Sequence, residues 1–176
     1  MRILGIDPGL RITGYACLES AALQGATAFQ RRQFLAAHLF EAGVLRLNAK
    51  TTISDRLAEL DADLKEVIER LNPDAVAVEK LYAHYKHPTT AIVMGHARGI
   101  VLLNIRRANL KLIELGATEV KKSLTGNGHA GKAQMQEGVR VQLGLAARPE
   151  PADVADAIAI ALCALRRTRF ATLTSK

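Results

Sequence analysis

The sequence predicts a single α/β domain, built on a mixed sheet of five strands with helices on both faces. Short apolar runs of strand length, such as Met1–Asp7 and Ala75–Glu79, alternate along the chain with longer segments of helical periodicity. The first two runs are separated by a turn alone, whereas the later ones are separated by helical segments. A hairpin followed by strand–helix alternation is typical of a sheet covered on both sides.

The predicted strands are short and are bounded by turn residues. The first run stops at Pro8 and Gly9, which indicates a turn. The AVAVE run at 75–79 is too short for a helix and too apolar for an edge, so we expect it inside the sheet. The five predicted strands are residues 1–7, 13–18, 44–47, 75–79 and 110–115.

The helical segments carry recognisable start and stop signals. The clearest follows Ser54, a residue type that caps helices, and ends at Asn72 and Pro73. We expect Thr118 to cap a short helix that precedes a Gly-rich loop at 125–131. The remaining predicted helices span residues 90–107, 132–143 and about 153–167.

Two segments do not fit this alternation. Residues 19–41 are rich in Ala and Gln and contain Arg31 and Arg32, and their pattern favours neither a loop nor a helix. We interpret this stretch as an unusual insertion. Residues from about 168 to 176 are expected to form a basic C-terminal tail.

Length and composition exclude several classes of protein. The 176 residues are enough for one domain, spanning 1–176, with its own core. The two cysteines, Cys17 and Cys163, form neither a disulfide framework nor a Cys-rich zinc motif, which favours the cytoplasm. Charged residues interrupt the apolar N-terminal run, and no segment offers the ~20 uncharged apolar residues of a membrane span. We therefore expect a cytoplasmic protein without a membrane partner.

The positive charge is concentrated in the middle of the chain. The formal net charge is +7. Residues 80–149 hold 11 Lys and Arg against 3 Asp and Glu, whereas residues 1–79 hold 9 against 11. Such a basic region beside a more acidic one is expected for a polyanion-binding protein, although a solvated surface would give the same count.

Four carboxylates stand at the ends of predicted elements. Asp7 and Glu79 each end a strand, and Asp153 and Asp156 share one face at the start of the last helix. Carboxyl ends of parallel strands meet at one edge of a sheet, where such folds place ligands. Because clustered carboxylates repel one another, cations must balance them, and oxygen ligands select Mg²⁺ or Mn²⁺. Two such ions, ~4 Å apart, can cleave a phosphodiester.

Each acid also has a simpler explanation when it is considered alone. Asp7 before Pro8 and Gly9 could bond to its own turn, and Asp153 and Asp156 could be ordinary first-turn acids. Glu79 is harder to explain in this way, because a charge at the end of a buried strand is seldom structural unless it is paired. The combination favours a metal site.

Lysines flank the Gly-rich loop. Lys121, Lys122 and Lys132 could bracket a nucleic-acid backbone, while the loop glycines let main-chain N–H groups approach a phosphate. His129 could move protons or be a plain loop residue. A second histidine-rich segment, with His84, Tyr85 and His87, invites a zinc interpretation that its spacing supports poorly.

Five motifs occur in an order that resembles the RuvC-type Holliday junction resolvases. They are GIDPG at 5–9 with TGY at 13–15, AVAVEK at 75–80, GHARG at 95–99, VKKSLTGNGHAGKAQMQ at 120–136 and ADVADAIAIAL at 152–162. The resemblance covers nearly the whole chain except residues 19–41. GIDPG alone also opens actin-like ATPases and YqgF-type nucleases, but the later motifs make the combination specific.

The resemblance implies a ribonuclease H-like fold and a homodimer that binds four-way DNA junctions in homologous recombination and DNA repair. It places Asp7, Glu79, Asp153 and Asp156 on the metal-binding acids, whose Mg²⁺ ions drive symmetric nicking of two strands to 5′-phosphate and 3′-hydroxyl ends. It places Lys121 and Lys132 on phosphate-contacting positions and Tyr82 on an aromatic near the junction centre. A branch-migration helicase complex is the implied partner.

Two features depart from the family pattern, and two other classes of protein stay open. The 19–41 stretch is longer than expected, and Gly131 replaces the acidic or polar residue that commonly precedes the loop lysine. A YqgF-type nuclease that processes RNA would share Asp7 and a late Asp without the lysines around GNGHAG. A non-catalytic junction-binding protein could use the same fold as a scaffold, although the presence of all four acids argues against it.

Overall fold

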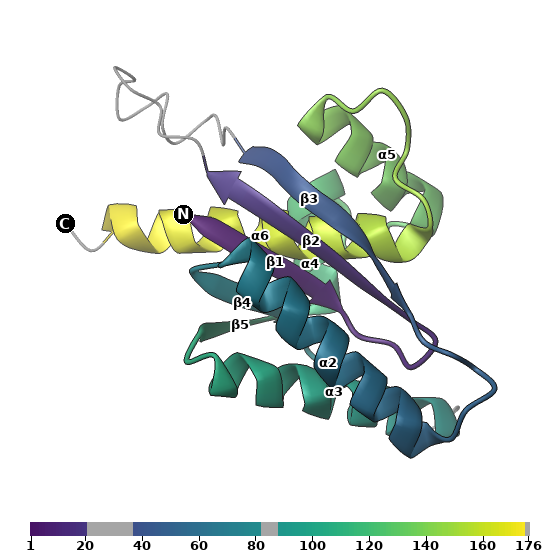
Figure 1. Cartoon of the computed structure of the whole chain (residues 1–176). Coiled ribbons are helices and arrows are strands. Elements are labelled where there is room, and N and C mark those ends of the chain that lie inside the picture. Colours follow the sequence, from purple (N-terminus) through teal and green to yellow (C-terminus); the bar gives the residue numbers. More distant parts are fainter. Residues whose placement is uncertain (21–36, 82–87, 175–176) are drawn as a thin grey trace.

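The computed structural model describes residues 1–20, 37–81 and 88–174, which form five strands and five helices around one sheet (Figure 1). The elements are β1 (Arg2–Asp7), β2 (Ile12–Ser20), β3 (Ala37–Arg46), α2 (Ile53–Leu71), β4 (Ala75–Glu79), α3 (Pro88–Arg107), β5 (Lys111–Leu115), α4 (Ala117–Thr125), α5 (Lys132–Leu143) and α6 (Ala152–Thr174). None of the helices in these ranges is long and apolar enough to cross a membrane.

The sheet is mixed, as the sequence predicts, with strand order β3-β2-β1-β4-β5. β2 pairs antiparallel with β1 and β3, whereas β4 is parallel to both β1 and β5. The AVAVE strand β4 is therefore interior, which agrees with its uninterrupted apolar character. Because β1 and β4 are parallel neighbours, their carboxyl ends lie at the same edge of the sheet.

The hairpin of β2 and β3 is longer than predicted. β2 continues to Ser20 and β3 begins at Ala37, whereas the prediction ended the second strand at residue 18 and began the third at 44. Ser20 pairs with Ala37 and Ile12 pairs with Arg46. Residues 37–40 alternate between partly buried and exposed, which is a strand pattern that the surrounding Ala and Gln obscured. Residues 21–36 lie outside the described residues.

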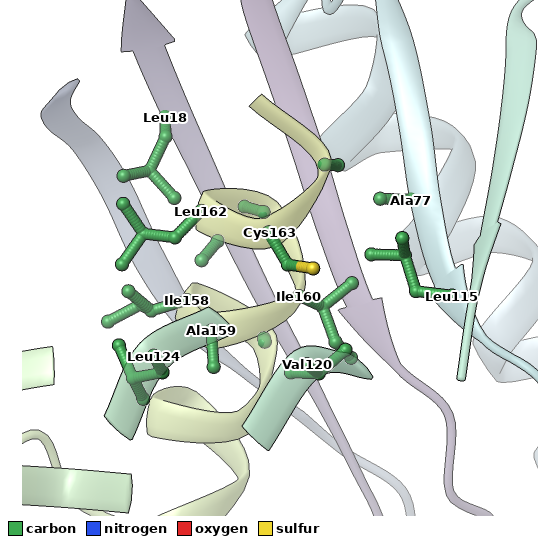
Figure 2. Close-up of a cluster of buried hydrophobic side chains, with 14 of the residues drawn as sticks. Leu18, Ala77, Leu115, Val120, Leu124, Ile158, Ala159, Ile160, Leu162 and Cys163 are labelled. Atoms are coloured by element: carbon green, nitrogen blue, oxygen red, sulfur yellow. The ribbon is translucent and has the colours of Figure 1, made fainter. Parts of the chain in front are cut away.

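One face of the sheet is covered by α4, α5 and α6. Leu18 of β2, Ala77 of β4 and Leu115 of β5 pack here with the buried residues Ile158 and Leu162 of α6 (Figure 2). The apolar stretch of α6 from Ala157 to Leu165 is buried throughout, because the sheet lies on one side of it and α4 and α5 on the other.

The opposite face is covered by α2 and α3. Leu60, Leu64 and Leu71 of α2 and Val101 of α3 pack with the side chains of β1 and β4 that point to this face. The two helices also share a partly buried hydrogen bond, in which the Asn104 amide donates to the Asp61 carboxylate at 2.7 Å. The prediction of helices on both faces is confirmed.

Helix boundaries differ from the predictions at α2, α4 and α6, and α3 begins at Pro88 rather than at residue 90. Thr52, not Ser54, caps α2: its hydroxyl accepts from the Asp55 N–H at 3.2 Å while the Asp55 carboxylate accepts from the Thr52 N–H. Gly116, not Thr118, precedes α4. α6 continues to Thr174, so most of the predicted 168–176 tail is helical, because no Gly or Pro follows Arg167 to end the helix.

Candidate active site

The strand pattern places Asp7 and Glu79 side by side on the α6 face of the sheet. Ile6 pairs with Val78, so the next residues, Asp7 and Glu79, end neighbouring parallel strands at one edge. Side chains alternate between the two faces along a strand. Ile3 and Ala77 belong to the α6-side core, and therefore Asp7 and Glu79 point to that face as well.

Two glycines let α6 lie directly on the sheet beside these acids. A Cβ on Gly5 would stand 2.3 Å from the Ala157 carbonyl oxygen, and a Cβ on Gly14 would stand 2.1 Å from the Asp153 carbonyl oxygen. Gly14 is also the residue that pairs with Asp7 across the hairpin. The first turn of α6, which carries Asp153 and Asp156, is thus held against the strand next to Asp7.

The four acids lie close enough to alter one another's protonation. Burial raises the pKa of Asp7 to about 7, and the charges of Asp156, Glu79 and Asp153 contribute to the rise. The pKa of Glu79 is raised by burial and by Asp156. The pKa of Asp156 is raised by burial and by Asp153. The structure therefore brings together the four carboxylates that the sequence predicts to converge.

Two of the three predicted lysines reach this acidic cluster. Lys132, the first residue of α5, lowers the pKa of Asp7 and Asp156, and Lys121 of α4 lowers that of Glu79 and Asp156. Lys122 is exposed and does not contribute to any of these shifts. Lys121 and Lys132 are thus close enough to the acids for their positive charges to act on them.

The loop between α4 and α5 is held by its own side chains. The Thr125 hydroxyl donates to the Lys121 carbonyl oxygen at 2.9 Å and accepts from the Asn127 N–H at 3.1 Å. Gly128 lies against Thr118, because a Cβ at Gly128 would be 2.5 Å from the Thr118 methyl group. His129 is exposed, and its N–H donates to the Asn127 side chain.

Thr13 stabilises the turn that follows Asp7, a role that the sequence does not reveal. This fully buried residue donates from its hydroxyl to the Gly9 carbonyl oxygen at 2.7 Å and accepts from the Gly9 N–H at 3.1 Å. Because both backbone groups of Gly9 are bonded, the chain is fixed immediately after the strand that carries Asp7. The only sequence signal for this role is that Thr13 lies four residues after the Pro8-Gly9 turn.

The donor set fits a hard divalent cation. All four candidate ligands are partly buried carboxylates, and hard oxygen ligands without Cys or His suit Mg²⁺ or Mn²⁺. As the side chains stand, no three acidic, His or Cys groups among the described residues are close enough to form a finished metal-binding cluster.

Tyr82, His84, Tyr85 and His87 lie outside the described residues. The predicted contact of Tyr82 with the junction centre and the alternative zinc site in this segment therefore stay predictions.

A carboxylate cluster at the edge of this sheet, flanked by lysines, defines a nuclease of the ribonuclease H-like class. A family model described as crossover junction endodeoxyribonuclease RuvC matches residues 3–164. The chain belongs to the RuvC family. This match, which extends over nearly the whole chain, does not favour the alternatives of a YqgF-type nuclease or a non-catalytic junction-binding protein.

Individual relatives agree with this assignment. The crossover junction endodeoxyribonuclease RuvC of Rhodopirellula baltica is 45% identical over 161 residues, which cover 92% of this chain and 84% of the relative. The solved structure of Thermus thermophilus RuvC in complex with a Holliday junction substrate superimposes with a TM-score of 0.82 at 33% identity, covering 98% and 97% of the two chains. The yeast mitochondrial Holliday junction resolvase Ydc2, at 14% identity and a TM-score of 0.63, shares the fold.

Proposed function

We propose that this protein resolves Holliday junctions by nicking two strands of like polarity, in homologous recombination and DNA repair. The observation that carries the proposal is the convergence of Asp7, Glu79, Asp153 and Asp156 at one sheet edge, next to Lys121 and Lys132. The membership of the RuvC family and the similarity to a RuvC bound to a Holliday junction support four-way DNA as the substrate.

The four acids are assigned to holding the divalent cations, Mg²⁺ or Mn²⁺, that such a reaction needs. When bound, these ions supply an activated water and neutralise charge on the leaving oxygen, which leaves a 5′-phosphate and a 3′-hydroxyl. Asp7 is the most strongly perturbed acid of the set, with a pKa of about 7. Cation binding at this carboxyl would displace the proton that Asp7 holds near neutral pH, so occupation of the site would depend on pH.

The lysines bind and orient the DNA strand. Lys121 and Lys132 lie on opposite sides of the loop at 126–131 and both act on the charge of Asp156. A phosphate held by both would lie beside the acids, with the loop backbone next to it. Lys122 is exposed and does not act on the charge of the acids, so it is assigned only to the flanking DNA backbone. Tyr82 is proposed to stack on a base near the centre of the junction.

Symmetric cutting requires two active sites, and the outer face of α3 offers a surface for a homodimer. Ile92 is 60% exposed and Leu103 is 42% exposed on this helix, and a Cβ on Gly99 between them would meet nothing within 4 Å. An apolar strip with a small residue at its centre suits close packing against a second copy in a two-fold interface. The helicase partner that the resemblance implies and the cytoplasmic location that the cysteine usage favours stay predictions.

Cleavage of a labelled, mobile four-way junction with and without Mg²⁺ tests the proposal. We expect paired nicks at symmetric positions in two strands, only with the metal present, and no nicks with Asp7→Asn. Structured RNA serves as the competing substrate. Preferential cutting of RNA would contradict the function, and unchanged cutting by Asp7→Asn would contradict the metal site.

A further inference from the structure

Arg98 of α3 contacts the strand end that carries Glu79. Its Nη1 donates to the main-chain carbonyl oxygen of Glu79 at 2.5 Å, and its Nη2 pairs with the carboxylate of Glu114 on β5. The Arg98 side chain is only 12% exposed. It is the arginine of the GHARG motif at 95–99. This motif contributes neither an acid nor a lysine to the candidate site.

The contact comes from the face of the sheet opposite to the acids. α3 packs on the α2 face through Ala97, Val101 and Ile105, whereas the Glu79 side chain points to the α6 face. Arg98 therefore holds the backbone of Glu79 from behind, while the carboxylate stays available on the other side. The next residue, Lys80, donates its N–H to the Leu115 carbonyl oxygen at 2.7 Å, which completes the anchoring of this strand end to β5.

The contact is geometric rather than electrostatic. The pKa of the Glu79 carboxyl responds to burial, to Asp156 and to Lys121, whereas the Arg98 charge is balanced by Glu114. A planar guanidinium holds two acceptors at fixed positions through donors on separate nitrogens, whereas a lysine ammonium offers its donors from one nitrogen on a flexible stem. Arginine at this position thus fixes the spacing between the ends of β4 and β5.

We propose that Arg98 is a positioning residue that sets the place of Glu79 in the metal site and couples it to helix α3. The inference rests on the proposed function, because it assumes that Glu79 is a ligand. Residues that orient a ligand from behind commonly change metal affinity or activity by about 10- to 100-fold when they are removed. Since α3 also carries the proposed dimer surface, a shift of this helix on dimerisation would reach Glu79 through Arg98.

The test compares Arg98→Met with Arg107→Met. Arg107 lies on the same helix and forms the same kind of ion pair, with Asp61 at 3.1 Å, but does not contact the strand end. We expect Arg98→Met to slow single-turnover cleavage at saturating enzyme by about 10- to 100-fold, with junction affinity measured in Ca²⁺ within about twofold of wild type. Arg107→Met is expected to cleave at the wild-type rate.

A second measurement does not depend on cleavage. Mn²⁺ should raise the unfolding midpoint of the DNA-free protein, since ligands that bind the folded state stabilise it. We expect the Mn²⁺ concentration for half of this rise to increase about 10-fold in Arg98→Met and to stay unchanged in Arg107→Met. If the wild type cuts no junction, the proposed function fails, but this titration still tests the role of Arg98.

Two further variants cover the case in which Arg98→Met does not fold. Arg98→Lys keeps the charge but loses the rigid fork of donors that fixes both acceptors, so it should cleave more slowly than wild type. Glu114→Gln keeps an oxygen acceptor for Arg98, so it should cleave faster than Arg98→Lys. Wild-type cleavage and Mn²⁺ response in Arg98→Lys would overturn the inference. So would a loss of junction affinity that matches the loss of rate, because Arg98 would then bind DNA directly.

Discussion

The two faces of the sheet hold their helices in different ways. On one face, α6 touches the strands backbone to backbone, because Gly5 and Gly14 leave no side chain between them. On the other face, α2 and α3 are kept apart from the strands by large side chains, among them Leu64, Val76 and Val78. The α6 face also contributes Asp153 and Asp156 to the site, whereas the α3 face contacts the Glu79 backbone through Arg98.

The two faces therefore differ in how firmly they fix the position of their helices. A helix seated on glycines has one position along the strand, so the α6 acids are fixed relative to Asp7 by the backbone itself. A helix that rests on side chains can shift slightly as rotamers change, and α3 keeps an exposed apolar strip on its outer side. The rigid face therefore suits the chemistry of the site, and the other face suits an interface.

Matched glycine substitutions should give the largest contrast between the faces. Gly5→Ala places a Cβ against the Ala157 oxygen and the Ala161 nitrogen of α6, at 2.3 and 2.7 Å, and backbone atoms cannot move aside cheaply. We expect a loss of about 3 kcal/mol or more in the free energy of unfolding, and no cleavage. Gly99→Ala on α3 finds open space and should change stability by less than about 1 kcal/mol.

Urea unfolding of both variants measures this contrast. Equal losses of stability would show that the backbone contact at Gly5 gives α6 no special rigidity. A destabilised Gly5→Ala protein that still cleaves junctions would show that the position of α6 does not control the site.

The second prediction concerns the stability that the folded protein loses by burying the ionised Asp7 carboxylate. Its pKa is raised from 3.8 to about 7, so the folded chain holds this proton more tightly than the unfolded chain. Metal-free wild-type protein should therefore lose stability as the pH rises from about 4 to about 7. Asp7→Asn removes this cost and should be more stable at pH 8 by up to about 4 kcal/mol, with the gain vanishing towards pH 4.

Thermal unfolding of wild type and Asp7→Asn between pH 4 and pH 8, in EDTA, checks the prediction. Mg²⁺ should narrow the difference at pH 8 by stabilising the wild type alone. Because Asp156 on α6 raises the pKa of Asp7 more than Glu79 on β4 does, Asp156→Asn should lower that pKa further than Glu79→Gln. If Glu79→Gln lowered the pKa of Asp7 further than Asp156→Asn, Glu79 rather than Asp156 would be the stronger charge acting on Asp7.

The third prediction distinguishes a lysine whose charge acts on the acids from one whose charge does not. Lys132→Ala removes a charge that lowers the pKa of Asp7 and Asp156, whereas Lys122 affects neither. We expect Lys132→Ala to weaken junction binding, to reduce the slope of log K against log salt by about 1 and to slow cleavage. Lys121→Ala should behave similarly, since Lys121 also acts on Asp156.

Lys122→Ala is the matched control. It should reduce the salt slope without slowing cleavage of a saturated complex. A slope that is unchanged in Lys132→Ala, or a loss of cleavage in Lys122→Ala, would contradict the assignment of the two roles.

The convergence of the four acids was easier to predict from the sequence than the contacts that position them. Asp7 and Glu79 were identifiable because each ends a short apolar run, and strand ends converge in any parallel sheet. Asp153 and Asp156 were identifiable from their spacing on one helix face. By contrast, the contact of Arg98 with the Glu79 carbonyl joins residues 19 apart in sequence, and no local pattern encodes it.

The errors in the predicted boundaries have similar causes. Thr52 and Ser54 are both good capping residues, and the capping box with Asp55 decides between them. The extension of β3 to Ala37 depends on pairing with β2 as far as Ser20, which its own composition does not indicate. Gly14 was expected only as part of a motif, because its close approach to the Asp153 backbone exists only in the folded chain.

The final prediction, with the smallest expected effect on the fold, uses two equally exposed apolar residues on different helices. Ile92 on α3 is 60% exposed and Val141 on α5 is 62% exposed, so Glu at either position should change the free energy of unfolding by less than about 0.5 kcal/mol. In a two-fold dimer through α3, Ile92→Glu would bring two like charges into the interface and shift sedimentation from dimer towards monomer. Val141→Glu should leave the dimer intact. If the two variants sediment alike, α3 is not the dimer interface. Its exposed apolar strip would then have no more role in dimerisation than the exposed Val141 of α5.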